Sequence, residues 1–140
     1  NLMLIGNYFK NINYKYKSHL FSGLSFNSSY CKKNYIFFAI KGSSMDGNKF
    51  IDHAIKNGAK TIVSNNKFKG IKNNVLFIKS NNVRKLLAEV SSKIYEKKPQ
   101  NLIAVTGTNG KSSIVNFYLQ ILKLNKKKCC INWNIRNPYN

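Results

Sequence analysis

The segment 104–117, AVTGTNGKSSIVNF, constrains the fold of this chain more than any other stretch. A short apolar run at 102–106 leads into a turn with Gly107 and Gly110, and a helical pattern follows over 112–124. A strand that enters such a turn and then a helix directs backbone N–H groups and the positive helix end toward one point. The segment therefore predicts a phosphate-binding loop, followed by a largely buried helix.

The rest of the chain alternates between the patterns of strands and helices. β-Prone runs bounded by turn residues predict strands at 22–27, 35–40, 60–64 and 74–79. One helical pattern lies between the strands at 35–40 and 60–64, and another follows the strand at 74–79. This alternation indicates the α/β class, and we find no internal repeat.

The first of these helices carries Phe50, Ile51, Ala54 and Ile55 on one side, and Gly58 stands where a C-cap glycine belongs. The second helix follows Asn81 or Asn82, either of which can cap it. Its apolar residues share one face, with helical spacing: Val83, Leu86, Leu87, Val90 and Ile94. A proline at position 99 then ends the pattern and predicts a linker.

Composition places the chain among globular proteins. At 140 residues and 43% hydrophobic content it can bury the core of one ordinary domain. No apolar run is long enough to span a membrane, and the first residues lack signal-peptide organisation, so we expect a soluble, cytoplasmic protein. Cys31, Cys129 and Cys130 have no metal-ligand spacing, which predicts reduced thiols.

The formal net charge of +20 raises the alternative of a basic nucleic-acid-binding module. The lysines are spread along the whole chain, however, and they accompany many asparagines, as in SNNKFKGIKNN. Lys and Asn share A-rich codons, so a solvated surface under codon bias explains both. We prefer that interpretation and expect no specific nucleic-acid partner.

The predicted loop offers each group that a nucleotide phosphate needs. Lys111 supplies a positive charge for the outer phosphates, and Ser112 supplies a hydroxyl for Mg²⁺. Val105 stands where the general motif has its first glycine, and the alternative is an ordinary glycine-containing turn. The predicted ATP-binding residues are Gly107, Thr108, Asn109, Gly110, Lys111, Ser112 and Ser113.

The sequence VTGTNGKSS resembles the ATP loop of the Mur ligases, which attach amino acids to a UDP-muramoyl peptide. The short loop that contains Thr-Asn and lacks the first glycine is their form, and the folylpolyglutamate synthetases share it. Residues 24–63 are in turn similar to the UDP-sugar-binding domain of the Mur ligases that add the third residue (MurE type). The matching positions are Phe37 or Phe38, Ala39, Gly42, Asp46, Gly47, Phe50, Ile51, Ala54, Gly58 and Ala59.

The resemblance also implies the residues that contact the UDP-sugar. These are Phe26, Ser28, Ser43, Ser44 and Met45. The chain departs from the family at its first element, where Asn-Ser-Ser replaces the usual Asp-Ser-Arg. A charge contact made by the missing arginine is therefore in question.

The implied activity is ATP-dependent amide-bond formation in peptidoglycan precursor synthesis, with ATP and Mg²⁺ as cofactors. ATP converts the D-Glu carboxylate of UDP-N-acetylmuramoyl-L-alanyl-D-glutamate into an acyl phosphate, which meso-diaminopimelate or L-lysine then attacks. The alternative within the family is the ligase that adds D-Ala-D-Ala, whose loop more often reads Ser-Asn-Gly-Lys. The pair Thr108-Asn109 favours the MurE type.

The resemblance predicts three regions: a UDP-MurNAc-peptide-binding domain (1–98), a truncated start of the ATP-binding domain (99–128) and an out-of-frame tail (129–140). All four acidic residues precede the loop, which disfavours a stand-alone NTPase and predicts a fragment inactive by itself. We interpret His19 and His53 as surface or helix-face histidines. Codons allowed for the tail, read one base later, encode Val-Ala-Ser-Ile-Gly-Thr-Leu-Gly, as the family expects there; the coding DNA tests this hypothesis.

Overall fold

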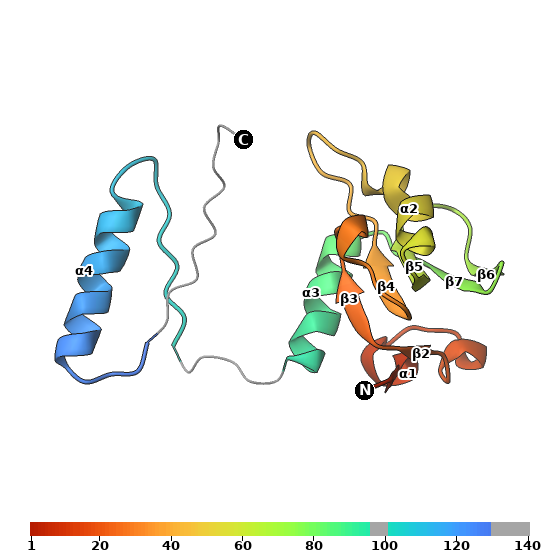
Figure 1. Cartoon of the computed structure of the whole chain (residues 1–140), viewed down its shortest axis with the longest axis horizontal. Coiled ribbons are helices and arrows are strands. Elements are labelled where there is room, and N and C mark those ends of the chain that lie inside the picture. Colours follow the sequence, from red (N-terminus) through yellow and green to blue (C-terminus); the bar gives the residue numbers. More distant parts are fainter. Residues whose placement is uncertain (96–100, 130–140) are drawn as a thin grey trace. The chain divides into compact units, whose positions relative to one another are not determined.

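The computed structural model describes residues 1–95 and 101–129. The chain forms two compact units, Asn1–Lys98 and Pro99–Asn140 (Figure 1). Most of the predicted linker and of the predicted out-of-frame tail lies outside the described residues. None of the described helices is long and apolar enough to cross a membrane.

The first unit is built on a five-stranded sheet with the strand order β3-β4-β5-β7-β6. Four neighbouring strands are parallel, and β6 pairs antiparallel with β7 at one edge. The strands are β3 (Gly23–Ser25), β4 (Tyr35–Phe38), β5 (Ala59–Ser64), β6 (Gly70–Lys72) and β7 (Val75–Lys79). The predicted α/β class is therefore confirmed, with a mixed, mostly parallel sheet.

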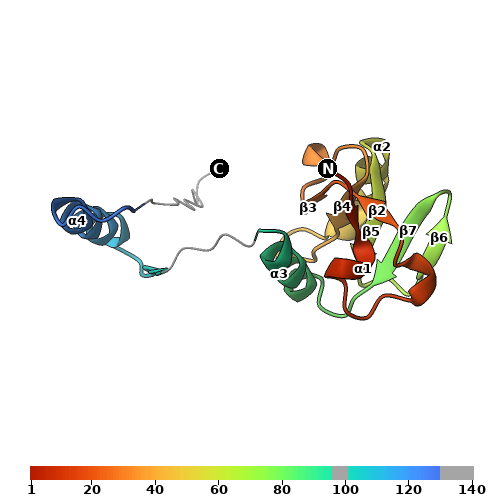
Figure 2. The same ribbon diagram turned by 90° about the horizontal axis from the view of Figure 1, so that it is seen from below.

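Alternating side chains of the central strands fill two cores, one on each face of the sheet. In β4, Ile36 and Phe38 enter one core while Phe37 enters the other. Helix α3 (Val83–Ile94) packs in the first core and α2 (Ile51–Lys56) in the second. Figure 2 shows these two helices on opposite sides of the strands.

Helix α3 forms as its sequence predicts. The Asn82 side chain accepts a hydrogen bond from the Lys85 backbone N–H at 2.9 Å, which caps the first turn. Val83 and Val90 are buried, and the three other members of the predicted stripe pack partly buried against the same core.

Helix α2 continues a short 3₁₀ segment, η3 (Gly47–Phe50), and ends before Gly58. Gly58 has a φ of +104°, and its N–H donates to the Ile55 carbonyl, so the predicted C-cap is confirmed. Ala54 is fully buried, whereas Phe50 remains 40% exposed. Phe50, a member of the predicted apolar side of this helix, is therefore less buried than expected.

The first 21 residues add a layer that the sequence did not predict. Strands β1 (Met3–Leu4) and β2 (Leu20–Phe21) form an antiparallel pair around α1 (Ile5–Tyr8) and the 3₁₀ turn η1 (Tyr14–Tyr16). Ile5, Phe9 and Phe21 are buried in the core under α3. The Lys93 ammonium donates to the Tyr8 carbonyl at 2.8 Å and thereby joins α3 to this layer.

A tight hairpin corrects the predicted strand 74–79. Lys72 of β6 pairs with Val75 of β7, leaving a two-residue turn of Asn73 and Asn74. Both asparagines have positive φ, at 50° and 62°, as a type I′ turn requires. Strand β7 therefore begins at Val75, after the turn.

The second unit contains α4 (Lys111–Leu124) within its described residues. The prediction of a strand at 102–106 is wrong in this structure, since no strand is assigned over 101–129 and a strand needs a partner for its backbone groups. The prediction of a largely buried helix is also wrong. No residue of α4 is buried, and Phe117 is 64% exposed, because the described part of this unit provides no sheet to cover it.

Candidate functional site

The carboxyl ends of the parallel strands define the edge of the sheet where ligands of open α/β folds bind. The chain leaves β3 into the 3₁₀ turn η2 (Ser28–Tyr30) and leaves β4 into a turn-rich loop at 41–46. All five residues that the sequence predicts for UDP-sugar contacts lie in these two connections. The fold therefore brings both predicted segments to the carboxyl edge, without testing their role.

Ser28 is the buried member of the predicted set, with 6% of its surface exposed. Its hydroxyl lies 2.9 Å from Nδ1 of His53, and its backbone carbonyl accepts from Nδ2 of Asn57 at 3.0 Å. The same Nδ2 lies 3.4 Å from Nε2 of His53. His53 lies in α2 and Asn57 is the C-cap of that helix, so α2 and its cap fix the position of Ser28.

Sequence reasoning missed this contact. His53 is exposed overall, as predicted, but its ring is hydrogen-bonded to Ser28. A signal was present, because positions 53 and 57 are four residues apart and share one helix face. Nothing in the sequence alone, however, places that face against the turn after β3.

The other predicted contacts are exposed. Phe26 follows β3 with 68% of its surface exposed, and Ser43, Ser44 and Met45 form the tip of the 41–46 loop. A hydrogen bond from the Gly42 N–H to the Met45 carbonyl, 2.8 Å long, closes this tip. The loop thus presents two serine side chains and one methionine side chain on a constrained backbone.

Asp46 anchors the base of the loop. Its carboxylate accepts from the Asn48 N–H at 2.9 Å and from Asn48 Nδ2 at 2.7 Å. These bonds from the Asn48 backbone and side chain, with Lys41 and Lys49 nearby, hold the pKa of Asp46 below its usual range. Asn48 Nδ2 also donates to Asn65 Oδ1 at 3.0 Å, which ties the loop to the end of β5.

A hollow of about 320 Å³ lies at this carboxyl edge, beside the base of the 41–46 loop. It contains two cationic side chains, Lys41 and Arg84, and no acidic one. The lining residues are Ala39, Ile40, Lys41, Asn65, Asn81, Asn82, Val83 and Arg84. None of the five predicted contact residues lines it. Because Lys41 begins the 41–46 loop, however, the hollow adjoins the predicted site.

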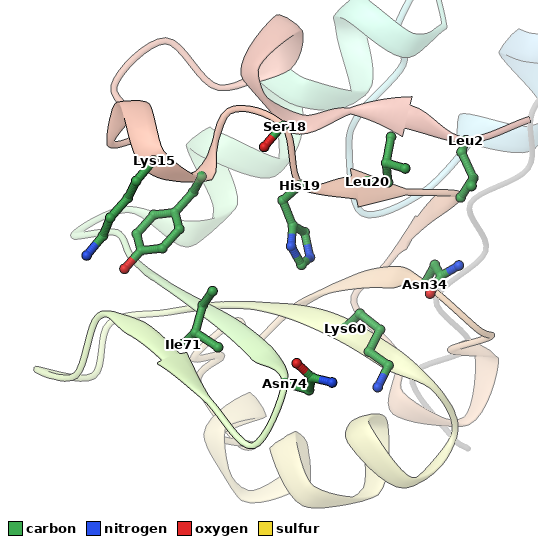
Figure 3. Close-up of a pocket in the computed structure, with 10 residues that line it drawn as sticks. Leu2, Lys15, Ser18, His19, Leu20, Asn34, Lys60, Ile71 and Asn74 are labelled. Atoms are coloured by element: carbon green, nitrogen blue, oxygen red, sulfur yellow. The ribbon is translucent and has the colours of Figure 1, made fainter.

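A second hollow, of about 560 Å³, lies at the opposite, amino edge of the sheet. Figure 3 shows His19, Lys60 and Asn74 around it. Burial lowers the pKa of His19, with a partial offset from the Lys60 backbone, and its Nε2 is buried without a hydrogen-bond partner among the described residues. Because the amino edge is not where such sheets bind ligands, we do not assign the predicted site to this hollow.

The predicted phosphate loop has the backbone of a helix-terminal turn. Gly107 and Gly110 both have positive φ, at +151° and +74°, and Gly110 is the N-cap of α4. No side chain caps the helix, so its first N–H groups are left for another acceptor. The Lys111 ammonium reaches back to the carbonyls of Gly107 and Thr108.

The donors of this loop suit a polyanion better than they suit a metal ion alone. Backbone N–H groups and one ammonium favour phosphate oxygens. For Mg²⁺ the loop supplies the single hydroxyl of Ser112, and residues 101–129 contain no carboxylate. Among the described residues, no group of three or more His, Cys, Asp or Glu side chains could hold a metal ion.

Comparison with known proteins identifies the family. A profile described as "Mur ligase family, catalytic domain" matches residues 20–100, more than half of the chain. The chain therefore belongs to the Mur ligase family. It is 46% identical over 118 residues to the UDP-N-acetylmuramoyl-L-alanyl-D-glutamate--2,6-diaminopimelate ligase of Rickettsia prowazekii, covering 84% of this chain. A second such ligase, from Clostridium acetobutylicum, is 36% identical over 103 residues, 72% of this chain and 21% of that protein.

A solved structure shares the fold. The MurF ligase from Thermotoga maritima, determined in complex with ADP, has a TM-score of 0.54 and 27% identity, covering 72% of this chain and 23% of that one. The chain spans about a quarter of the length of the curated relatives, 24% for the Rickettsia prowazekii ligase. The resemblance to MurE-type ligases that the sequence indicated is confirmed.

Proposed function

We propose that this chain is part of a MurE-type ligase, which uses ATP to add diaminopimelate to UDP-N-acetylmuramoyl-L-alanyl-D-glutamate during cytoplasmic synthesis of the peptidoglycan precursor. The observation that carries this proposal is the 46% identity to a diaminopimelate ligase. Because the matched 118 residues exceed the 98 of the first unit, the similarity extends into the second unit, where the phosphate loop lies.

We assign the binding of the UDP-sugar to residues 1–98. Ser28 and the 41–46 loop lie at the carboxyl edge of the parallel sheet, where this type of fold binds ligands. The family's arginine is replaced at Ser29, but Lys41 and Arg84 line the adjoining hollow. These two cations are suited to the negative charge of a diphosphate, and they offset the charge missing at Ser29.

We assign residues 99–128 to the start of an ATP-binding domain, in which bound ATP supplies the phosphoryl group that activates the substrate carboxylate. The N–H groups at the start of α4 and the Lys111 ammonium would hold the phosphates and neutralise their charge. Ser112 would offer its hydroxyl to the accompanying Mg²⁺.

The chain by itself is expected to bind nucleotide without completing the reaction. Residues 101–129 contain no carboxylate and no histidine, so they provide neither an acidic Mg²⁺ ligand nor a general base. The measurement is ADP release in the presence of UDP-N-acetylmuramoyl-L-alanyl-D-glutamate and diaminopimelate. Release that requires both substrates would contradict this expectation.

Two other functions remain as competitors. The ligase that adds D-Ala-D-Ala is represented by the structural match, but at 27% identity against 46% for the diaminopimelate ligase. A nucleic-acid-binding module is suggested by the charge of +20 alone. The identity favours the diaminopimelate ligase over both.

Equilibrium dialysis of the 140-residue chain tests the proposal. We expect saturable binding of labelled UDP-N-acetylmuramoyl-L-alanyl-D-glutamate that unlabelled UDP displaces. Duplex DNA in the same experiment tests the nucleic-acid alternative, which predicts an affinity that falls steeply as salt is raised. Tight, salt-dependent DNA binding without any UDP-sugar binding would overturn the proposal.

A further inference from the structure

The hydrogen bonds among Ser28, His53 and Asn57 determine whether the Ser28 hydroxyl donates or accepts. Ser28, His53 and Asn57 form one connected group, in which the Ser28 backbone carbonyl can only accept. The atom of Asn57 that lies 3.0 Å from this carbonyl must therefore be the amide nitrogen. This contact settles the orientation of the Asn57 amide.

The second hydrogen of the same amide nitrogen is available to His53. Nδ2 of Asn57 lies 3.4 Å from Nε2 of the ring, and two donors do not face each other favourably. Nε2 is consequently the acceptor. A neutral imidazole carries one proton, so that proton resides on Nδ1.

The proton on Nδ1 of His53 points to the Ser28 oxygen, 2.9 Å away. The Ser28 oxygen accepts this bond, and its own hydrogen remains free to be donated elsewhere. A doubly protonated ring would also donate from Nδ1, so the direction of this bond holds for both charge states of His53.

We propose that His53, held in one tautomer by Asn57, is a positioning residue that makes Ser28 a hydrogen-bond donor to the UDP-sugar. The group that Ser28 recognises is then an acceptor, a carbonyl or phosphate oxygen, and not an N–H of the ligand. This inference rests on the proposed function only for the identity of the ligand. The direction of the hydrogen bonds follows from the three side chains.

A first experiment examines the tautomer without any ligand. The ¹⁵N chemical shifts and long-range ¹H–¹⁵N couplings of the imidazole in the 140-residue chain report which nitrogen carries the proton. The signals of His53 are separated from those of His19 by their loss in His53→Asn. We expect the proton on Nδ1 at a pH where the ring is neutral. A proton on Nε2 would overturn the inference, whether or not the chain binds a UDP-sugar.

A second experiment uses two isosteric variants, His53→Asn and His53→Asp. The asparagine amide can donate to the Ser28 oxygen as Nδ1 does, whereas the aspartate carboxylate accepts only and turns the hydroxyl toward itself. In dialysis with UDP-N-acetylmuramoyl-L-alanyl-D-glutamate, we expect His53→Asn to stay within about twofold of the parent and His53→Asp to bind about tenfold more weakly.

The Ser28→Ala background distinguishes positioning from a structural or purely electrostatic role. Once the hydroxyl is removed, His53→Asp and His53→Asn should bind with equal affinity, within about twofold. A tenfold difference that persists without the hydroxyl would show that His53 acts by another route and would overturn the inference. If the parent chain binds no UDP-sugar at all, the proposed function fails, and the tautomer experiment alone decides this inference.

Discussion

At the scale of single residues, two glycines with positive φ allow the cost of backbone strain to be distinguished from the cost of a steric clash. Gly58 has a φ of +104°, and a Cβ there would lie 2.9 Å from the Lys33 backbone. Gly70 has a φ of +131°, but the nearest atom to its Cβ would be 3.5 Å away, at ordinary contact distance. Both substitutions to alanine therefore cost strain, and only one also creates a clash.

We expect Gly70→Ala to lower the free energy of unfolding by about 1–2 kcal/mol, the cost of a strained backbone. Gly58→Ala should cost at least about 1 kcal/mol more, because the Lys33 backbone must also move. Urea unfolding followed by far-UV circular dichroism measures both. Equal losses in the two variants would show that the contact with Lys33 is not tight.

Asp46 gives the stability of the first unit a dependence on acid. Its pKa is lowered by the hydrogen bonds from Asn48, so the unfolded chain binds the proton more readily than the folded chain. The ionised carboxylate stabilises the fold above the usual carboxyl range. This contribution is lost as the pH falls below that range and through the folded pKa.

The variant Asp46→Ala removes the acceptor at every pH. We expect its urea midpoint to lie below that of the parent at pH 7 and the two midpoints to converge as the pH falls below the usual carboxyl range and through the folded pKa of Asp46. Asn48→Ala removes the side-chain donor to Asp46, together with the bond to Asn65, but keeps the backbone donor, so it should retain part of the parent's dependence on pH. A difference between Asp46→Ala and the parent that stays constant over this range would contradict the assignment.

At the scale of elements, the sequence predicts those parts whose pattern and ends are local. Helix α3 was predictable because Asn82 caps it and a five-residue apolar stripe runs along it. The β6–β7 hairpin was equally local, since an Asn-Asn pair favours positive φ at both turn positions, but only β7 was predicted, and β6 and the turn were missed. The layer of the first 21 residues depends on contacts with α3, which no local pattern reveals.

In the candidate site, too, local features were predictable and contacts between distant segments were not. Its segments, the 41–46 loop and the turn of the phosphate loop, were predictable from short motifs. The pairing of Ser28 with His53 was not, because it joins the turn after β3 to helix α2, 25 residues apart in sequence. The burial of α4 was predicted wrongly. Its apolar pattern shows which face of the helix is suited to burial, but not whether the described chain contains an element that packs against that face.

Helix α4 carries an apolar stripe that is exposed in this structure. Its members are Ile114, Phe117, Tyr118, Ile121 and Leu124, each at least 43% exposed. Such a stripe binds apolar dyes. We expect Phe117→Lys to reduce the fluorescence of the dye ANS markedly, because a charge is placed within the stripe. Asn116→Lys, which adds the same charge to the neighbouring position outside it, should leave the fluorescence nearly unchanged; equal effects would contradict this prediction.

At the scale of the whole molecule, the chain combines an α/β unit with a second unit that carries the predicted phosphate loop. Each carries features of the Mur ligase family: the match over 20–100 and the identity that continues into the second unit. The two hollows of the first unit lie at opposite edges of one sheet. In the proposed function the UDP-sugar binds at the carboxyl edge, although the larger hollow lies at the amino edge.

The most direct test is a ¹H–¹⁵N NMR titration of the 140-residue chain with UDP-N-acetylmuramoyl-L-alanyl-D-glutamate. We predict saturable shifts of the backbone signals of Ser28 and of the 43–45 tip, with His19 and Asn74 at the amino edge unaffected. Shifts confined to the amino edge, or no saturable shift at either edge, would contradict the proposal that the carboxyl edge of this sheet binds the UDP-sugar.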